Sequence, residues 1–318
     1  MQIGCSSWSG RWRQDPTPTT ETELPVPPTD RHSPSRSPVR WAELVPAGAF
    51  EALRRLRDVG GLAVLTDRFS GSGRYRTPMT DLLYLPDADG VTEFSATVTE
   101  ATEEYIVLEG TYFYPEGGGQ PPDHGAIAWD GGRAEIDDVR KDHGDVRHEI
   151  GWLEGEPPEP GTTVDCEIDA DRRERLSRMH TAQHVVSRVV LEEYGAETAG
   201  NQVGPDRSRI DFEPADFAGT DLQRIERLSN EAIERDLAVT KAERPRDRVE
   251  AEVDEGRALL DLIPDSVDPL RVVEIEEFDT CPCGGTHVDA LGEIGRVAVV
   301  DRTSKGADVE RVTFELEG

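Results

Sequence analysis

The sequence predicts an α+β fold in which a small β-barrel-like domain is followed by a second domain of mixed helices and strands. Short runs of β-branched and aromatic residues, separated by Gly, Pro and Asp turns, fill residues 79–169. Near residue 171 the apolar period lengthens to helical spacing. Helices and strands then follow without regular alternation, which is typical of an α+β domain over residues 170–318.

Residues 1–78 differ from the rest in composition. They carry 11 arginines, no lysine, 8 acidic residues and 9 of the 22 prolines. Such a segment buries too little apolar surface to order itself. We expect either a disordered arm or upstream sequence joined by a misassigned start codon, since Met79 begins a well-patterned acidic stretch. No function is assigned to it.

Four strands are predicted in the barrel-like domain, at residues 94–98, 105–108, 126–129 and 164–168. A glycine-rich run, YPEGGGQPPDHG, occupies residues 114–125 between the second and third strands. In the second domain, Asp171 is predicted to cap a long helix with Glu174 as its capping-box partner. Gly195 ends that helix. The other predicted elements are helices at 221–237 and 248–262 and strands at 209–212, 270–275, 296–300 and 309–316.

The chain is strongly acidic, with 65 acidic against 35 basic residues and a net charge of −30. This charge normally argues against a nucleic-acid partner, because phosphate contacts need cations. Dense carboxylates also suit a salt-rich cytoplasm, where screening removes long-range effects. We favour salt adaptation over a functional acidic surface, and the charge then neither supports nor excludes RNA. The sequence has no membrane span or secretory signal, so a cytoplasmic location is expected.

His180 and His184 are four residues apart on the long predicted helix, so their side chains share one face. Two imidazoles at this spacing can bind one metal ion. The alternative is two incidental polar residues on a helix. A zinc-protease motif would need Glu after the first His, and Thr181 occupies that position.

Residues 280–288 read TCPCGGTHV and supply the second half of a metal site. The glycine pair between Cys283 and His287 lets the loop fold back, so that a thiolate and an imidazole converge. With the two helical histidines they complete the tetrahedral N/S set that zinc prefers. Cys281 makes five candidate ligands for four positions, and we expect it to lie near the site without binding the metal. The alternative for Cys283 is a buried free thiol.

These motifs together resemble the editing domain of alanyl-tRNA synthetase and its free-standing relatives, the AlaX proteins. The resemblance covers residues 79–318 and is carried by HTAQH at 180–184, CGGTH at 283–287, FYPEGGGQ at 113–120 with Asp123 and Gly125, and GEIG at 292–295. It implies a zinc-dependent trans-editing deacylase that removes serine, and often glycine, from alanine tRNA. It also implies that residues 170–318 form the editing domain. Its metal ligands would be His180, His184, Cys283 and His287, and Gln202 falls near a pocket glutamine of the synthetase domain.

The resemblance leaves several roles open. Zinc could activate water, polarise the ester carbonyl or only position the substrate. Selecting serine over alanine requires polar groups beside the metal, and the candidates are Gln202, Thr198 and Thr286. Ordinary turn or helix-end polarity is the alternative for each. Candidate contacts to the acceptor end of tRNA are Gly117, Gly118, Gly119, Gln120, Arg302, Lys305 and Arg311; a plain tight turn and a solvated loop are their alternatives.

Two other functions stay open at this point. The first is a zinc-stabilised RNA-binding module without catalysis. The second is editing of another mischarged tRNA, such as serine-charged threonine tRNA. The oligomeric state is not predicted.

Overall fold

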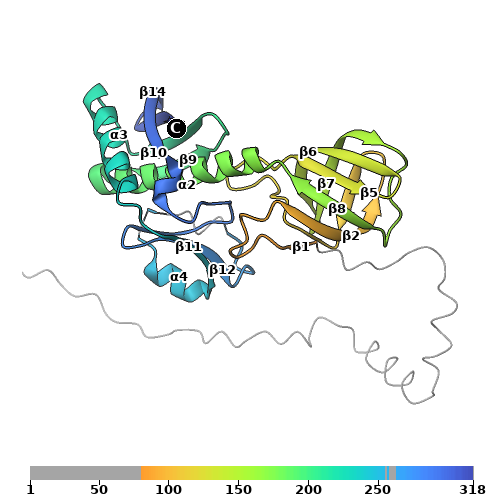
Figure 1. Cartoon of the computed structure of the whole chain (residues 1–318). Helices are drawn as coiled ribbons and strands as arrows, with labels where there is room; N and C mark the ends of the chain where they lie inside the picture. Colours follow the sequence, from red (N-terminus) through yellow and green to blue (C-terminus); the bar gives the residue numbers. More distant parts are fainter. Residues whose placement is uncertain (1–79, 255, 258–262, 318) are drawn as a thin grey trace, which may run out of the picture. The chain divides into compact units, whose positions relative to one another are not determined.

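The computed structural model describes residues 80–254, 256–257 and 263–317 (Figure 1). The predictions for residues 1–78 therefore lie outside the described residues. The described residues belong to one compact unit. A domain boundary near residue 169 stays a prediction. None of the helices in the described ranges is long and apolar enough to cross a membrane.

Six strands close into an antiparallel barrel in the order β2-β3-β7-β6-β5-β8. Their bounds are Glu93–Ala101 (β2), Tyr105–Leu108 (β3), Gly125–Trp129 (β5), Gly132–Asp142 (β6), Asp145–Glu154 (β7) and Thr163–Ile168 (β8); the short strands β1 (Asp81–Leu82) and β4 (Gly110–Thr111) pair with each other outside the barrel. Strand alternation builds the core, since Val164, Cys166 and Ile168 of β8 point inward between exposed neighbours. The four predicted strands and the barrel are confirmed.

The long helix α2 spans Ala170–Tyr194. It ends at Gly195, as predicted, which has φ 64° and donates its N–H to the Leu191 carbonyl. The predicted cap is wrong by two residues: Asp169 caps the helix, and its carboxylate accepts the Arg172 N–H at 3.0 Å. Asp171 lies inside the first turn, where a negative charge still suits the helix dipole.

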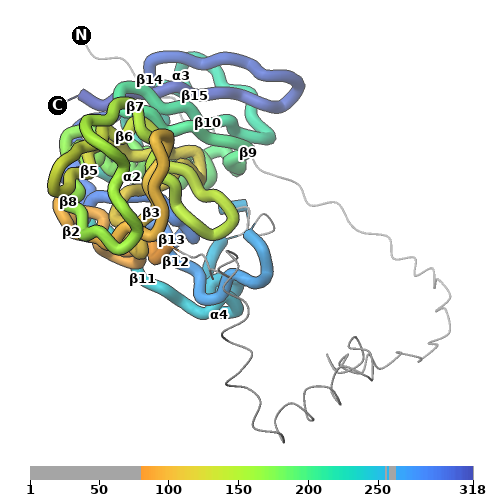
Figure 2. Tube along the Cα trace, turned by 90° about the vertical axis from the view of Figure 1, so that its right-hand side faces the viewer, coloured from red at the N-terminus to blue at the C-terminus, as the bar shows by residue number. Residues whose placement is uncertain are grey.

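In the described ranges, two sheets and three shorter helices follow α2 in the chain. A four-stranded sheet has the order β14-β15-β10-β9, and a three-stranded sheet has the order β11-β12-β13. Figure 2 shows β14 and β15 as a long hairpin at one edge of the first sheet. The bounds are β9 Glu197–Gln202, β10 Ser208–Glu213, β11 Val239–Arg244, β12 Leu270–Ile275, β13 Asp279–Pro282, β14 Arg296–Gly306, β15 Val309–Glu317, α3 Gly219–Ile233, α4 Arg246–Glu252 and the 3-10 helix η4 Leu291–Ile294.

The predicted strands of this part are confirmed. The helix predicted at 221–237 is present as α3, which ends four residues earlier, at Ile233. The helix predicted at 248–262 is too long. Its described part, α4, ends at Glu252, because Val253 has an extended backbone with ψ 129°. Residues 255 and 258–262 of that prediction lie outside the described residues.

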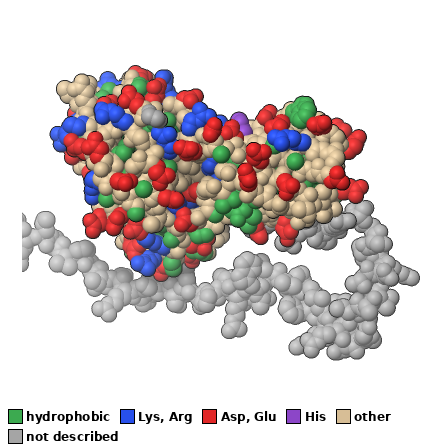
Figure 3. All heavy atoms as spheres, viewed as in Figure 1, with side chains coloured by type: hydrophobic (Ala, Val, Ile, Leu, Met, Phe, Trp, Pro, Cys, Tyr) green, Lys and Arg blue, Asp and Glu red, His purple; other side chains and the backbone are tan. Residues whose placement is uncertain are grey.

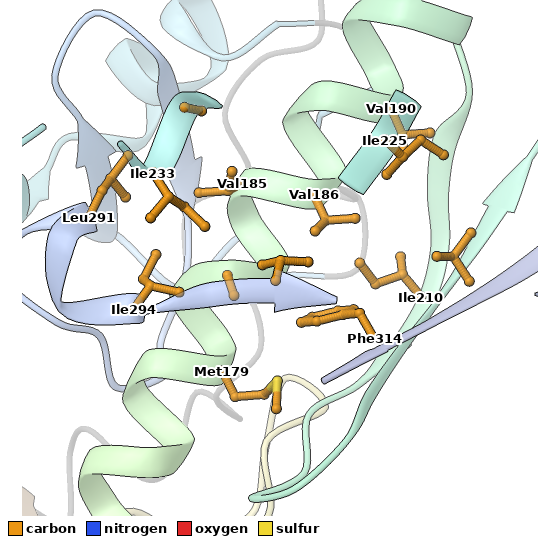
Figure 4. Close-up of a cluster of buried hydrophobic side chains, with 14 of the residues drawn as sticks. Met179, Val185, Val186, Val190, Ile210, Ile225, Ile233, Leu291, Ile294 and Phe314 are labelled. Atoms are coloured by element: carbon orange, nitrogen blue, oxygen red, sulfur yellow. The ribbon is translucent and has the colours of Figure 1, made fainter. Parts of the chain in front are cut away.

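The core of this part forms around α2. Val186 and Val190 of the helix lie beside Ile225 of α3 and Ile210 of β10 (Figure 4). Fourteen residues of α2 are buried, so this helix is held on several sides. A helix packed in this way is a rigid support for any side chain that it carries.

Candidate metal centre

Helix α2 supplies two imidazoles from its middle turns. His180 and His184 have ring centroids 5.4 Å apart and are almost fully buried. They lie within a run of buried residues from Met179 to Ser187, so their positions are set by the packing of the helix. The predicted pairing on one helix face is confirmed.

The loop after β13, residues 283–287, brings the other two candidate ligands to the helix. This approach depends on Gly285, because a Cβ there would lie 2.1 Å from His180 Cε1 and 2.3 Å from its Nδ1. Gly284 faces open space and is not required in the same way. The sequence predicted that both glycines let the loop fold back, but only Gly285 is needed for the close approach to His180.

The four side chains converge on one point. One ligand atom each from His180, His184, Cys283 and His287 lies within 4.8 Å of the others. Cys283 Sγ is 3.6 Å from His180 Nε2 and 3.3 Å from His287 Nε2. Three imidazoles and one thiolate form a donor set that suits tetrahedral zinc. The cluster is consistent with a Zn²⁺ site.

The protonation of the cluster also suits a metal. Burial acts to raise the pKa of Cys283, but the adjacent His180 and His287 outweigh it and hold this pKa well below its usual value. Burial lowers the pKa of His287 well below its usual value, against the effect of Cys283. The cysteine therefore favours the thiolate, which is the form that binds zinc.

The Nδ1 atom of His180 is fixed by the glycine-rich run. Gln120 Oε1 lies 2.7 Å from His180 Nδ1 and accepts the Thr286 N–H at 3.0 Å. The Gln120 amide donates to Thr286 Oγ1 at 3.0 Å. Because the carbonyl oxygen can only accept, it selects the tautomer with hydrogen on Nδ1 and leaves Nε2 free for the metal.

The other two histidines are oriented similarly. Thr181 donates its hydroxyl hydrogen to the Ser177 carbonyl at 2.9 Å, so its oxygen accepts from His287 Nδ1 at 3.1 Å. Asp279 Oδ2 lies 3.7 Å from His184 Nδ1 and is paired with buried Arg257. His180 and His287 thus turn Nε2 toward Cys283, whereas His184 Nδ1 also lies 3.4 Å from Arg257 Nη2.

A buried ion pair holds the backbone of the 283–287 loop. Arg271 donates to the carbonyls of Cys283 and Gly285 at 2.9 and 2.7 Å. Asp89 pairs with Arg271 at 2.9 Å and accepts the His287 N–H at 3.0 Å. Nothing in the sequence connects these two residues, which are 182 positions apart.

Cys281 is not part of the described four-residue cluster. It is buried in β13 opposite Val273 of β12, and burial raises its pKa to about 12. It is therefore a protonated thiol, in contrast to Cys283. That it does not bind the metal stays a prediction.

Comparison with known proteins gives the family. The model of class II (A) tRNA synthetases matches residues 81–172, and the model of the second additional domain of threonyl and alanyl tRNA synthetases matches residues 270–313. The AlaX-M alanyl-tRNA editing protein of Methanosarcina barkeri is 38% identical over 242 residues, which cover 75% of this chain and 99% of that protein. This chain belongs to the AlaX-M family.

Two further relatives each match about three quarters of the chain. The AlaX-M protein of Methanosarcina acetivorans is 36% identical over 244 residues and is covered to 99%. The alanine–tRNA ligase of Methanopyrus kandleri is 40% identical over 247 residues, but the match covers only 26% of its length. The chain therefore spans nearly all of an AlaX-M protein and about a quarter of such a ligase.

The glycine-rich run of this AlaX-M member forms a tight turn against the metal centre. Gly118 and Gly119 have φ of 55° and 82°, and a Cβ on Gly119 would lie 2.5 Å from the Asn201 amide nitrogen. Gln120 is 1% exposed. The predicted contact of the Gln120 side chain with RNA is therefore wrong, because this side chain is buried against His180.

The structure also corrects the position of Gln202. Asn201, its neighbour in β9, donates its amide hydrogen to Gln183 Oε1 at 2.9 Å and to the Gly118 carbonyl at 3.1 Å. Adjacent strand residues face opposite sides, so Gln202 points away from α2 and is exposed. The sequence analysis did not name Gln183. Its position between the two histidines was the available signal, but helix spacing alone does not distinguish a residue of the site from a packing residue.

The remaining predicted residues divide between buried and exposed positions. Thr198 faces α2 and donates to Ser187 Oγ at 3.1 Å, and Thr286 is completely buried between Gln120 and Ser177. Arg302 and Lys305 are exposed on β14, and Arg311 of β15 pairs with Asp211. The predicted RNA contacts of these three cations stay predictions.

Proposed function

We propose that this chain hydrolyses the ester between serine and tRNA(Ala), and the glycine ester as well, at the four-residue metal centre. The observation that supports this most is a buried His₃Cys cluster in a chain that aligns with nearly the whole length of proteins named alanyl-tRNA editing proteins. Its partner would be the acceptor end of tRNA(Ala), and its place of action the cytoplasm.

The residues of the centre fit the chemistry of ester hydrolysis. His180, His184, Cys283 and His287 would hold the metal. Bound there, zinc would supply a Lewis acid for the ester carbonyl or lower the pKa of a water. Gln120 and Thr181 hold the imidazoles of His180 and His287 in their binding orientation, which keeps the geometry constant while the substrate enters.

Two amides beside the centre are suited to recognise the serine hydroxyl. Gln183 and Asn201 bond to each other across the same turn that carries Gln120. In the described residues, the side-chain atoms Gln183 Nε2 and Asn201 Oδ1 make no hydrogen bond. They therefore offer one donor group and one acceptor to a ligand. A site that hydrogen-bonds a substrate hydroxyl can reject the analogue lacking it by about 10⁴ or more. We therefore assign serine selection to these residues in place of Gln202.

Two other functions each have one observation in their favour. Four protein ligands fill a tetrahedron, which is typical of structural zinc and would suit an RNA-binding module without catalysis. The model matched at residues 270–313 is shared with threonyl synthetases, which would suit serine-charged tRNA(Thr) as substrate.

One assay separates the three. Purified protein is given tRNA(Ala) charged with serine, glycine or alanine, and tRNA(Thr) charged with serine, and release of the amino acid is followed. We expect release of serine and glycine from tRNA(Ala) and much slower release of alanine. Preferential hydrolysis of the tRNA(Thr) ester would favour the second alternative. Binding without release from any of the four would favour the non-catalytic module.

A further inference from the structure

A surface cavity of about 380 Å³ lies on the four-stranded sheet, and arginines outnumber carboxylates among the residues that line it. Three guanidinium groups line it, from Arg207, Arg209 and Arg311, against one carboxylate, from Asp301. The whole chain has nearly two acidic residues for each basic one. A local excess of arginine on such a protein points to an anionic ligand.

Strand register places these groups on the face of the sheet that is turned away from α2. Ile210 and Phe212 of β10 are buried in the core, so Arg209, which alternates with them, faces the other side. Arg209 is paired with Thr313 of β15 on one side and with Gln202 of β9 on the other. The cavity therefore lies on β9, β10 and β15, with Asp301 of β14 beside them.

The three arginines differ in what already neutralises them. Arg311 makes two hydrogen bonds to Asp211, at 2.6 and 2.8 Å, and Arg207 bonds to Glu315 at 2.8 Å. Arg209 is exposed and makes no hydrogen bond or ion pair with any residue in the described ranges. Its five N–H donors are all available, in the planar fork that matches the oxygens of a phosphate.

One residue that lines the cavity is hydrogen-bonded to the glycine turn that supports the metal centre. Val203, which lines the cavity, donates its N–H to the Gly119 carbonyl at 2.8 Å. The next residue, Gln120, contacts His180. The turn therefore connects the strand that borders the cavity to the residues around the proposed metal ligands.

We propose that this cavity binds a backbone phosphate of the tRNA acceptor arm, with Arg209 as its main donor and Arg207 and Arg311 beside it. This proposal rests on the proposed function, because the phosphate belongs to the same tRNA whose serine ester is hydrolysed at the metal centre. Phosphate contacts fix the register of a nucleic acid without reading its sequence, which is the requirement for presenting a 3′ end to a fixed site.

The test compares Arg209→Ala with Arg248→Ala in the full chain. Arg248 is an exposed arginine of α4, which packs on the other sheet, so its removal changes the net charge equally. Affinity for uncharged tRNA(Ala) is measured over a KCl series. We expect Arg209→Ala to weaken binding about tenfold and to reduce the salt slope by about one. Arg248→Ala should match the parent, and Arg209→Lys should retain the salt slope because it keeps the charge.

Serine release distinguishes failure of this proposal from failure of the proposed function. If the parent protein releases serine and Arg209→Ala raises KM while kcat and zinc content stay unchanged, the phosphate site is supported. If the parent releases serine but both alanine variants bind tRNA equally well, the site is refuted and the deacylase is not. Inorganic phosphate is the third arm: competition lost in Arg209→Ala, with tRNA affinity unchanged, would show a free-anion site and also refute the proposal.

Discussion

At the scale of single residues, the 283–287 loop can approach helix α2 closely because Gly285 has no side chain. A methyl group there would overlap the His180 ring, whereas one at Gly284 would meet nothing within 4 Å. We predict that Gly285→Ala displaces the 283–287 loop and lowers zinc affinity at least tenfold, and that Gly284→Ala leaves it unchanged. Competition with a chromophoric chelator measures both. Equal affinities would contradict this account of the loop.

Gln120 gives a second test at this scale. Gln120→Leu leaves the buried Thr286 N–H and the His180 ring without their acceptor, and we predict a 10- to 100-fold loss of zinc affinity. Gln120→Glu keeps an acceptor and should retain most of it. Gln202→Leu is the matched control on the outer face of β9. The assignment fails if Gln120→Leu and Gln202→Leu bind zinc with the same affinity.

The sequence predicted the four cluster residues because their spacing is local: four residues on a helix, and four across a glycine loop. It did not predict their hydrogen-bonding partners. Gln120 and Asp89 reach the centre from segments far away in the chain, and no periodicity links either to His180 or His287. Nor did it predict that Gln202 is exposed on the outer side of β9, because one residue of strand register reverses the side that a side chain faces.

At the scale of elements, strand β7 of the barrel contains a buried imidazole that should make the fold sensitive to acid. His148 bonds to the Ile106 carbonyl and the Thr111 hydroxyl, both at 2.9 Å, and burial lowers its pKa to about 4. An unfolded histidine takes up a proton near pH 6.5. Between these values the unfolded chain binds the additional proton, so this group makes stability fall as the pH drops from about 6.5 to 4.

We predict that His148→Gln reduces this loss by up to about 3 kcal/mol across that window. The free energy of unfolding by urea, measured at fixed salt from neutral to acid pH, tests it. The difference between the parent and the variant cancels the other titrating groups, including the metal ligands. Parallel pH profiles would show that His148 does not cause the effect.

The hairpin β6–β7 shows why some elements were not predicted. Its strands contain many Arg, Asp and Glu residues, and only alternate positions such as Ala134, Ile136 and Val146 enter the barrel core. Such strands have no apolar run, although they follow the alternation of a half-exposed sheet. The opposite error affected 248–262, where an apolar pattern continued beyond the end of α4 at Glu252.

At the scale of the whole molecule, the net charge of −30 acts on the folded state itself. Asp and Glu side chains are spread over the face shown in Figure 3, among fewer Lys and Arg. Their mutual repulsion favours the unfolded chain, and salt screens it. We predict that Tm rises with KCl concentration, by about 2–4 °C for each 1 kcal/mol gained. A Tm that is flat or falls over the series would contradict adaptation to salt.

The central claim is that serine release occurs at the His180–His184–Cys283–His287 centre with zinc bound. It is tested most directly by one measurement: the rate of serine release from Ser-tRNA(Ala) in preparations of the parent chain whose zinc content is titrated from none to one ion per chain. The account predicts a rate proportional to zinc content, with His184→Ala neither binding zinc nor releasing serine. Release at full rate from the metal-free protein would contradict it.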